Sequence, residues 1–205
     1  MSIYFLEEKT MDFSESKTKE NLARAFAAEC QDGARYQFIA KDAKQNQMNY
    51  ISTILKMLAK NEMAHAKMFY QHLVDNLQTK NGNVNIEAGY PFKQSELKTS
   101  LASAAVIEDY ESQNIYPAFA KVAKDEGFPE IAKTFTLVAE VEKVHAQKLA
   151  DLGEMFNHHK LYKSQTPRMY ECSNCGHRET KKEAWKTCPL CNYPQGYVII
   201  NFENQ

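Results

Sequence analysis

The sequence lacks the features that mark membrane, secreted and all-β proteins. No run of 18 uncharged apolar residues occurs in its 205 residues, so no segment is expected to span a bilayer. The first residues show neither the basic stretch nor the apolar stretch of a signal peptide, and we therefore expect a cytoplasmic protein. With 7 glycines and 6 prolines, the chain is also too poor in turn-forming residues for an all-β fold.

An excess of charge of one sign is missing as well. The 25 basic and 26 acidic residues leave a formal net charge of −1. No bulk electrostatic field therefore draws the chain to nucleic acid or to an anionic membrane, and we expect neither as a partner. The hydrophobic share of 43% is enough for a buried core and argues against disorder. The length predicts one or two domains.

Sparse helix-breaking residues divide most of the chain into four long helices. Gly127 and Pro129 separate the last two helices in the order that helix ends and starts prefer. The first two and the last two helices are joined by short turns, whereas the central connection is long enough to cross the height of a bundle. A four-helix bundle with one long crossover is the ferritin-like connectivity. The expected helices and crossover are residues 18–45, 49–79, 95–127 and 129–157, with the crossover at 80–94.

The residue composition of the chain changes at Lys160. The remaining segment is short, rich in turn residues and aromatics, and contains two Cys-x-x-Cys pairs. We therefore expect two domains, an all-α bundle over residues 1–159 and a small metal-stapled domain over residues 160–205.

Each predicted helix has one apolar face that points into the bundle. Ionisable residues interrupt this face at about the same height in all four helices. The pattern Glu-x-x-His starts at Glu62 and Glu142, which follow Glu29 and Glu108 by 33 and 34 residues, respectively. This internal repeat indicates two related helix pairs. Residues three apart share a helix face, so each pair points into the bundle. The predicted inward set is Glu29, Glu62, His65, Glu108, Glu111, Glu142 and His145.

Five carboxylates in one core require positive charge nearby, because burying an isolated carboxylate is strongly unfavourable. Two divalent cations would nearly neutralise them. Oxygen and imidazole ligands suit iron or manganese, and Glu residues combined with two Glu-x-x-His pairs are typical of dimetal carboxylate bundles. A single Glu-x-x-His could simply lie on a solvent-exposed helix face. That explanation does not account for ionisable residues at matching positions on the inward faces of all four helices.

The cysteine pairs predict a second metal site. Cys172-x-x-Cys175 and Cys188-x-x-Cys191 are separated by 12 residues, and four thiolates at this spacing bind one ion tetrahedrally. Sulfur ligation suits iron and zinc, so the spacing leaves the metal open. A zinc ribbon therefore remains an alternative. The basic charge of this segment fits a nucleic-acid ribbon as well as docking against an acidic bundle, and we favour docking.

In this order, the motifs resemble the rubrerythrin family over nearly the whole chain. The resemblance implies a di-iron ferritin-like bundle followed by a rubredoxin-like domain that holds one iron, with zinc as a possible substitute. It implies a peroxidase that reduces hydrogen peroxide to water and protects against oxidative stress. Electrons would come from a reductase or a rubredoxin, ultimately from NAD(P)H, and would pass through the four-cysteine iron. Head-to-tail homodimers are implied as well.

The resemblance also assigns the ligands. Glu62 and Glu142 would bridge the two irons. The other ligands would divide into Glu29 and Glu111 on the first iron, and Glu108 and His145 on the second.

Four residues are implied to act in catalysis. On reduction, the first iron would exchange Glu111 for His65, since an anionic ligand suits the ferric ion and a neutral ligand suits the ferrous ion. Tyr36 and Tyr116 correspond to tyrosines that hydrogen-bond the site. Pro117 follows at once, and a proline inside a helix bends it, which would give Glu111 room to move.

Two other functions fit parts of this pattern. Ferritins oxidise and store iron with the same type of bundle, but they lack the sulfur segment and form cages. A non-catalytic zinc-ribbon protein on a helical scaffold is the second alternative. The metal content and colour of the purified protein distinguish these functions from a peroxidase.

Overall fold

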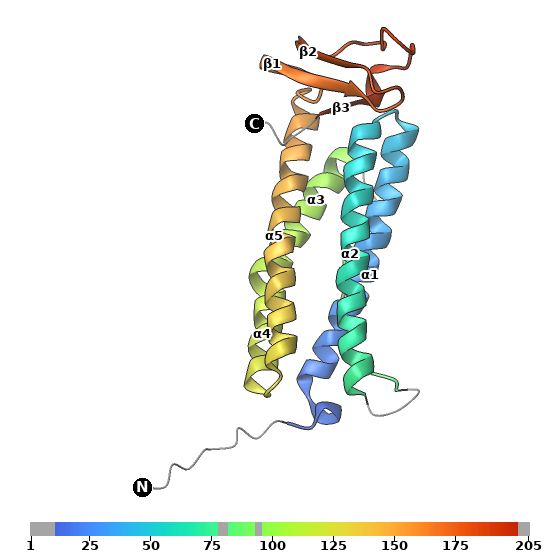
Figure 1. Ribbon diagram of the computed structural model, residues 1–205. Coiled ribbons are helices and arrows are strands. Elements are labelled where there is room, and N and C mark those ends of the chain that lie inside the picture. Colours follow the sequence, from blue (N-terminus) through green and yellow to red (C-terminus); the bar gives the residue numbers. More distant parts are fainter. Residues whose placement is uncertain (1–10, 78–81, 93–95, 201–205) are drawn as a thin grey trace. The chain divides into compact units, whose positions relative to one another are not determined.

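The computed structural model describes residues 11–77, 82–92 and 96–200 and is mainly helical (Figure 1). A small antiparallel sheet of three strands follows the last helix. The helices and strands are α1 (Lys17–Gln45), α2 (Asn49–Asn76), α3 (Leu97–Tyr110), the π-helical segment η2 (Glu111–Ile115), α4 (Tyr116–Asp125), α5 (Pro129–Asn157), β1 (Lys163–Cys172), β2 (Arg178–Glu183) and β3 (Val198–Ile200), with short 3-10 helices at η1 (Phe13–Glu15) and η3 (Gln195–Tyr197).

Contacts within the chain divide it into two compact units. The first unit comprises residues 1–31, 62–92 and 106–146, and the second comprises residues 32–61, 93–105 and 147–205. Segments of all the long helices therefore occur in both units, and the described strands belong to the second. The expected domain boundary after residue 159 stays a prediction.

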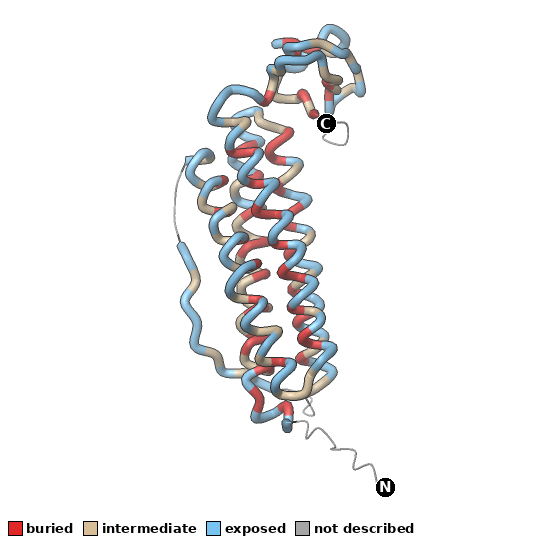
Figure 2. Tube along the Cα trace, turned by 90° about the vertical axis from the view of Figure 1, so that its left-hand side faces the viewer, coloured by how far each residue is buried: buried red, intermediate tan, exposed pale blue. Residues whose placement is uncertain are grey.

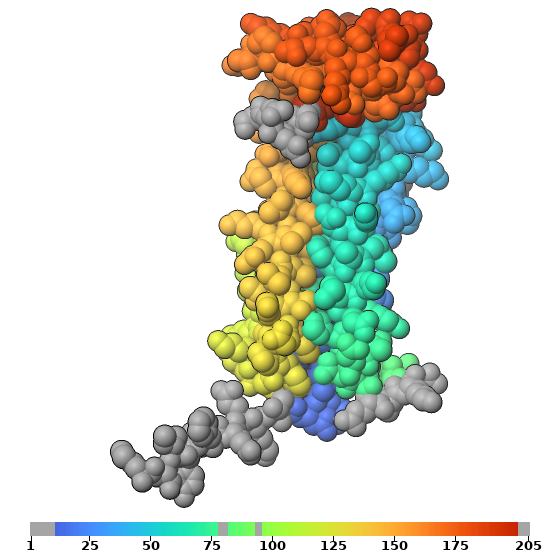
Figure 3. Space-filling model, in the orientation of Figure 1, coloured from blue at the N-terminus to red at the C-terminus, as the bar shows by residue number. Residues whose placement is uncertain are grey.

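The long helices are amphipathic. Buried residues follow one side of each helix and face the neighbouring helices of the same unit (Figure 2). Within the described ranges, no helix combines the length and the apolar character needed to cross a membrane. On the face drawn in Figure 3, side chains of α2 and α5 meet and cover the interior.

Aromatic side chains fill the core of the first unit. The ring centroids of Phe69 and Phe135 are 5.1 Å apart, and the Tyr116 ring stacks on Phe69 at 5.7 Å. All three side chains have at most 1% of their surface exposed. Burying a side chain of this size contributes about 1.5–3 kcal/mol to folding, so this cluster fixes where α2, α4 and α5 meet.

The long crossover between α2 and α3 is partly described. Residues 82–92 form neither helix nor strand, and Val84 and Ile86 pack against the core of the first unit. Arg24 anchors this segment, because its Nε donates to the carbonyl of Glu87 and its own carbonyl accepts from the Tyr90 hydroxyl. The helix end predicted near Thr79 and the helix start predicted near Ser95 lie outside the described residues.

The predicted third helix differs from expectation in its middle. Residues 97–125 are helical, but the segment from Glu111 to Ile115 is a π-helix, in which the backbone N–H of Tyr116 donates to the carbonyl of Glu111. Pro117 follows directly and has no N–H to donate to the preceding turn. The helix was expected to bend here, but a π-helical segment was not expected.

The second unit combines helical segments with the sheet. The strand order is β2-β1-β3, and Tyr170 of β1 pairs with Glu179 on one side and Ile200 on the other. Buried Tyr36 and Leu149 from the helices and Trp185 after β2 belong to one continuous hydrophobic core. The ferritin-like helical fold and the small strand-containing C-terminal segment are therefore as predicted.

Candidate metal centres

Six of the seven predicted carboxylate and histidine ligands converge in the first unit. Glu29 comes from α1, the first Glu-x-x-His from α2, Glu108 from α3 and the second Glu-x-x-His from α5. Each carboxylate has at most 3% of its surface exposed. We call this group the carboxylate–histidine site; it consists of Glu29, Glu62, His65, Glu108, Glu142 and His145.

The site has two halves that share two carboxylates. In the first half, His65 Nδ1 lies 2.8 Å from Glu142 Oε1, 3.1 Å from Glu62 Oε2 and 3.3 Å from Glu29 Oε2. In the second half, His145 Nδ1 lies 2.8 Å from Glu142 Oε2 and 3.0 Å from Glu62 Oε1. Glu62 and Glu142 thus present one oxygen to each half, as bridging ligands between two cations would.

Each half is completed by a carboxylate of its own. Glu29 belongs to the first half, and Glu108 Oε2 lies 4.0 Å from His145 Nδ1 in the second. Within each half, one ligand atom of every residue lies within 4.8 Å of the others. The two imidazole rings are stacked with centroids 5.8 Å apart.

The electrostatics of the site favour bound cations. Burial, together with the neighbouring carboxylates, raises the pKa of Glu29 and of Glu108 well above the usual range. Burial alone would lower the pKa of both histidines, but hydrogen bonds to carboxylates outweigh it and raise the pKa of His65 to about 12 and of His145 to about 9. Protons held by these carboxyl and imidazole groups therefore offset the buried carboxylate charge, which is the compensation that two cations would provide.

These residues fit a pair of iron ions. The donor set contains only oxygen and imidazole nitrogen, which suits iron, and the two shared carboxylates suit two adjacent ions of +2 charge or more. In the first half, the residue beside Glu29 is His65. Glu111, the predicted alternative ligand, is half-buried in η2 and belongs to neither group of ligand atoms found among the described residues.

The two predicted tyrosines lie in different units. Tyr116 is fully buried in the first unit, and its hydroxyl donates to Glu29 Oε1. Burial, the nearby carboxylates and this hydrogen bond raise the Tyr116 pKa well above its usual value, so the hydroxyl stays protonated and able to donate. Tyr36 is fully buried in the core of the second unit. Its role at the site stays a prediction.

The four cysteines form two equivalent loops in the second unit. The N–H of Cys172 donates to the carbonyl of His177, and the N–H of Cys188 donates to that of Tyr193, each at 2.8 Å. The residue after each pair has positive φ, 74° at Gly176 and 59° at Asn192. Glycine and asparagine are the residues that adopt this conformation most readily. Each Cys-x-x-Cys pair thus forms the same tight turn and directs two sulfurs to one point.

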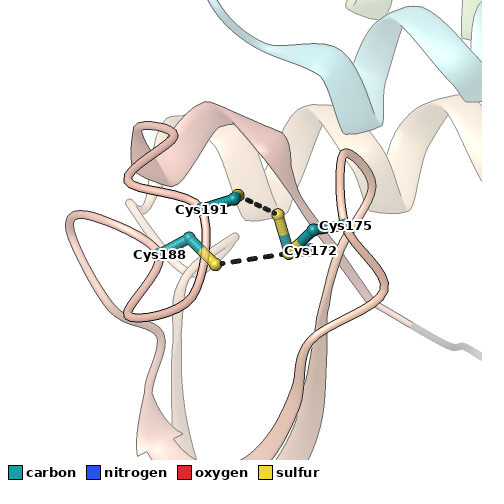
Figure 4. A group of neighbouring side chains, drawn as sticks. All are labelled: Cys172, Cys175, Cys188 and Cys191. Atoms are coloured by element: carbon teal, nitrogen blue, oxygen red, sulfur yellow. Dashed lines mark hydrogen bonds between the residues drawn. The ribbon is translucent and has the colours of Figure 1, made fainter.

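The sulfur positions fit one tetrahedral ion. Sγ of Cys172 lies 3.6 Å from Sγ of Cys191, and Sγ of Cys175 lies 3.7 Å from Sγ of Cys188 (Figure 4). A metal–sulfur bond of about 2.3 Å in a tetrahedron requires sulfurs about 3.8 Å apart. The structure therefore brings all four predicted thiolates together, and we call them the four-cysteine site.

One functional feature was missed by reading the apolar stripe. The same 3–4 residue pattern places Ile115, like Glu111, on the inward face. Both are half-buried and Ile115 packs against the core, but the fully buried positions are their neighbours Ser112 and Tyr116. The register shifts by one residue at the π-helical segment. Pro117 was the signal in the sequence that marked this place.

Comparisons with known proteins agree with this arrangement. A family model described as Rubrerythrin matches residues 20–168. The rubrerythrin of Clostridium perfringens is 39% identical over 186 residues, covering 90% of this chain and 94% of that protein. Rubrerythrin-1 of Clostridium acetobutylicum is 38% identical, with 92% and 96% covered.

Solved structures show the same fold. The mixed-valence state of nigerythrin superimposes with a TM-score of 0.60 at 23% identity, covering 98% of each chain. Its fully reduced, all-ferrous state gives 0.59 at 24% identity with the same coverage. Symerythrin from Cyanophora paradoxa gives 0.57 at 21% identity, covering 76% of this chain and 98% of that one. At these identities, the likeness shows a helical ferritin-like fold.

Proposed function

The chain belongs to the rubrerythrin family, and from this premise we propose that it reduces hydrogen peroxide to water at the carboxylate–histidine site. Members of this family are di-iron proteins of the oxidoreductase type, and the two sites described above correspond to the family's iron centres.

One observation carries the proposal. Glu62 and Glu142 each direct one oxygen to His65 and the other to His145, and this buried arrangement supports two adjacent cation positions. Cleaving the O–O bond of peroxide takes two electrons and two protons and releases two waters. The carboxylate–histidine site would hold a pair of ferrous ions, which would supply these two electrons and act as Lewis acids.

The chain's own residues hold and orient this site. The Tyr116 hydroxyl donates to Glu29 and fixes the rotation of that carboxylate, while the aromatic cluster around Phe69 excludes water from one side. We assign Glu111 and His65 as alternative ligands of the first position. His65 Nδ1 lies 3.3 Å from Glu29 Oε2, and Glu111 is close enough to Tyr116, whose hydroxyl bonds Glu29, to raise the Tyr116 pKa.

The four-cysteine site supplies the route for electrons in this proposal. A four-thiolate iron exchanges one electron at a time, and the five described cysteines are free of disulfides. The electron donor is a reductase or a rubredoxin linked to NAD(P)H. A head-to-tail homodimer would bring the four-cysteine site of one subunit to the carboxylate–histidine site of its partner. A reducing, cytoplasmic compartment suits both centres.

Stopped-flow mixing tests the substrate. The iron-loaded full-length protein is reduced without oxygen and mixed with peroxide or with oxygen-saturated buffer. We expect oxidation by peroxide to be at least tenfold faster, with two electrons used per peroxide. Faster oxidation by oxygen would instead support iron oxidation as the activity. A colourless protein with zinc in the four-cysteine site would support the zinc-ribbon alternative.

Glu111 is tested by the same measurement. Glu111→Ala should slow peroxide turnover and leave the iron–thiolate absorption unchanged, because Glu111 lies in a different unit from the cysteines. Glu140→Ala is the matched control, since Glu140 is exposed on α5. Equal turnover in the two variants would refute the role assigned to Glu111.

A further inference from the structure

The helix that carries Glu108 aligns two buried groups at the site more closely than a regular α-helix would. Glu108 and Tyr116 are each 1% exposed, and Tyr116 reaches Glu29 on the opposite helix pair. Eight residues separate them. At about 100° per residue, eight residues of α-helix would leave the two side chains about 80° apart around the axis.

The π-helical segment removes this mismatch. The N–H of Tyr116 bonds to the carbonyl of Glu111 five residues earlier, so one extra residue is accommodated within a single wide turn. With that residue absorbed, Glu108 and Tyr116 are effectively seven residues apart and about 20° from alignment. Both side chains then face the interior, as observed.

Pro117 disfavours the regular α-helical alternative. In an α-helix, the N–H of residue 117 would donate to the carbonyl of Gln113, but proline has no N–H and its ring clashes with that carbonyl. The buried hydroxyl of Ser112 adds to the distortion by donating to the carbonyl of Asp109 at 2.9 Å. Glu111 begins the widened turn and is half-buried.

We propose that Pro117 is a positioning residue of the carboxylate–histidine site. It holds η2 in its π form, and this form keeps Glu108 and Tyr116 on one face of the helix while placing Glu111 in the widest turn. The inference rests on the proposed di-iron function, because it assigns a purpose to a backbone irregularity at that site. Pro117 itself is exposed.

Two variants distinguish an effect of Pro117 on the alignment of side chains along the helix from an effect on local stability alone. Pro117→Ala restores a donor at residue 117, so η2 relaxes toward an α-helix and Tyr116 rotates away from Glu29. Combining Pro117→Ala with deletion of the exposed Asn114 removes the extra residue, so an α-helix again aligns Glu108 with Tyr116. The control is Pro129→Ala, because Pro129 begins α5, where a missing N–H has no partner to lose.

Cobalt(II) titration of the full-length protein provides the readout. We expect Pro117→Ala to weaken cobalt binding at the carboxylate–histidine site about tenfold, the usual effect of disturbing groups that orient ligands. The cobalt–thiolate absorption of the four-cysteine site should not change, and this serves as an internal control. The deletion variant should recover the wild-type affinity to within about threefold.

Each outcome decides the inference. Unchanged affinity in Pro117→Ala, or a deletion variant as weak as Pro117→Ala, would overturn the role of Pro117. If Pro117→Ala does not fold, the deletion variant decides alone: tight binding supports the register argument and weak binding refutes it. A wild-type protein that binds no cobalt at the carboxylate–histidine site would instead contradict the proposed function.

Discussion

Glu62 and Glu142 stand in equivalent positions, each turning one oxygen to His65 and the other to His145. The four distances lie between 2.8 and 3.1 Å. The internal repeat of the sequence is thus expressed as an approximate symmetry of the site. A shared carboxylate would contribute to both proposed cation positions, whereas Glu29 and Glu108 would contribute to one each.

The difference between shared and unshared carboxylates predicts how many ions are lost when each type is substituted. Glu142→Gln keeps the shape but removes the charge shared by both halves, so we expect loss of both ions. Glu29→Gln weakens one half and should leave about one ion bound per chain in addition to the four-cysteine ion. Metal analysis after gel filtration measures the stoichiometry. Glu140→Gln on the exposed side of α5 serves as a control, and equal losses in the two site variants would contradict the bridging assignment.

Metal removal is predicted to destabilise the first unit. The buried carboxylates repel one another, and a ligand present at about 100 times its Kd stabilises the folded state by about 2.7 kcal/mol. For a chain of this length, that corresponds to a Tm lower by roughly 5–11 °C after chelation. Calorimetry before and after treatment with chelator, with iron added back, measures the change. A Tm that does not respond to iron would show that the carboxylate–histidine site binds no cation in the folded state.

The pairing of ligands on each helix was predictable from the sequence, because residues three apart, such as Glu62 and His65, lie on one face of any α-helix. The four cysteines were predictable because two short turns of fixed spacing determine the sulfur positions. Both inferences depend on local geometry, which the order of residues specifies directly.

The register beyond Glu111 was not predictable in this way. A regular helical period continues the inward face from Glu111 to Ile115, which is half-buried, whereas the π-helical segment makes Tyr116 the fully buried residue. Such a segment is locally less favourable than an α-helix. It is stabilised here by Pro117, which disfavours the α-helical alternative, and by the packing of Tyr116 on Phe69. Periodicity contains no information on that packing.

A carboxylate far along the chain caps the first helix. Glu126 accepts hydrogen bonds from the backbone N–H groups of Lys17 and Thr18, at 3.0 and 2.9 Å, and from the Thr18 hydroxyl at 2.6 Å. Helix N-termini have N–H groups without internal partners, and a negative charge there is favourable. Glu126→Ala should therefore reduce the free energy of unfolding by about 1–2 kcal/mol. Urea unfolding measures this change, and Glu140→Ala, in which no cap is lost, should stay within about 0.5 kcal/mol of wild type.

Gly196 makes a close backbone contact within the second unit. A β-carbon at this position would fall on the carbonyl oxygen of Gln47, in the turn between α1 and α2. Because a backbone atom has little freedom to move aside, we expect Gly196→Ala to lower stability by about 1–3 kcal/mol. Gly89→Ala is the matched control, since its β-carbon would meet open space. Thermal unfolding compares the two, and a Gly196→Ala variant as stable as Gly89→Ala would show that the contact is dispensable.

His72 makes the stability of the first unit depend on pH. Its Nε2 lies 2.8 Å from the Thr134 hydroxyl, and burial lowers its pKa despite the opposing influence of Asp75 and Glu130. Because the folded state binds a proton at His72 less readily than the unfolded state does, the unfolded state gains protons first as pH falls. Stability is therefore lost as pH falls below the unfolded pKa of about 6.5.

His72→Gln should remove this part of the pH dependence. Relative to wild type, the variant is expected to lose less free energy of unfolding between pH 7.5 and 5, because glutamine does not titrate. Urea unfolding of both iron-loaded proteins across that range measures the difference, and the other titrating groups cancel in the comparison. His158→Gln is the control, since His158 is exposed beyond the end of α5. Parallel pH profiles for wild type and His72→Gln would mean that His72 protonates equally well in the folded and unfolded chain.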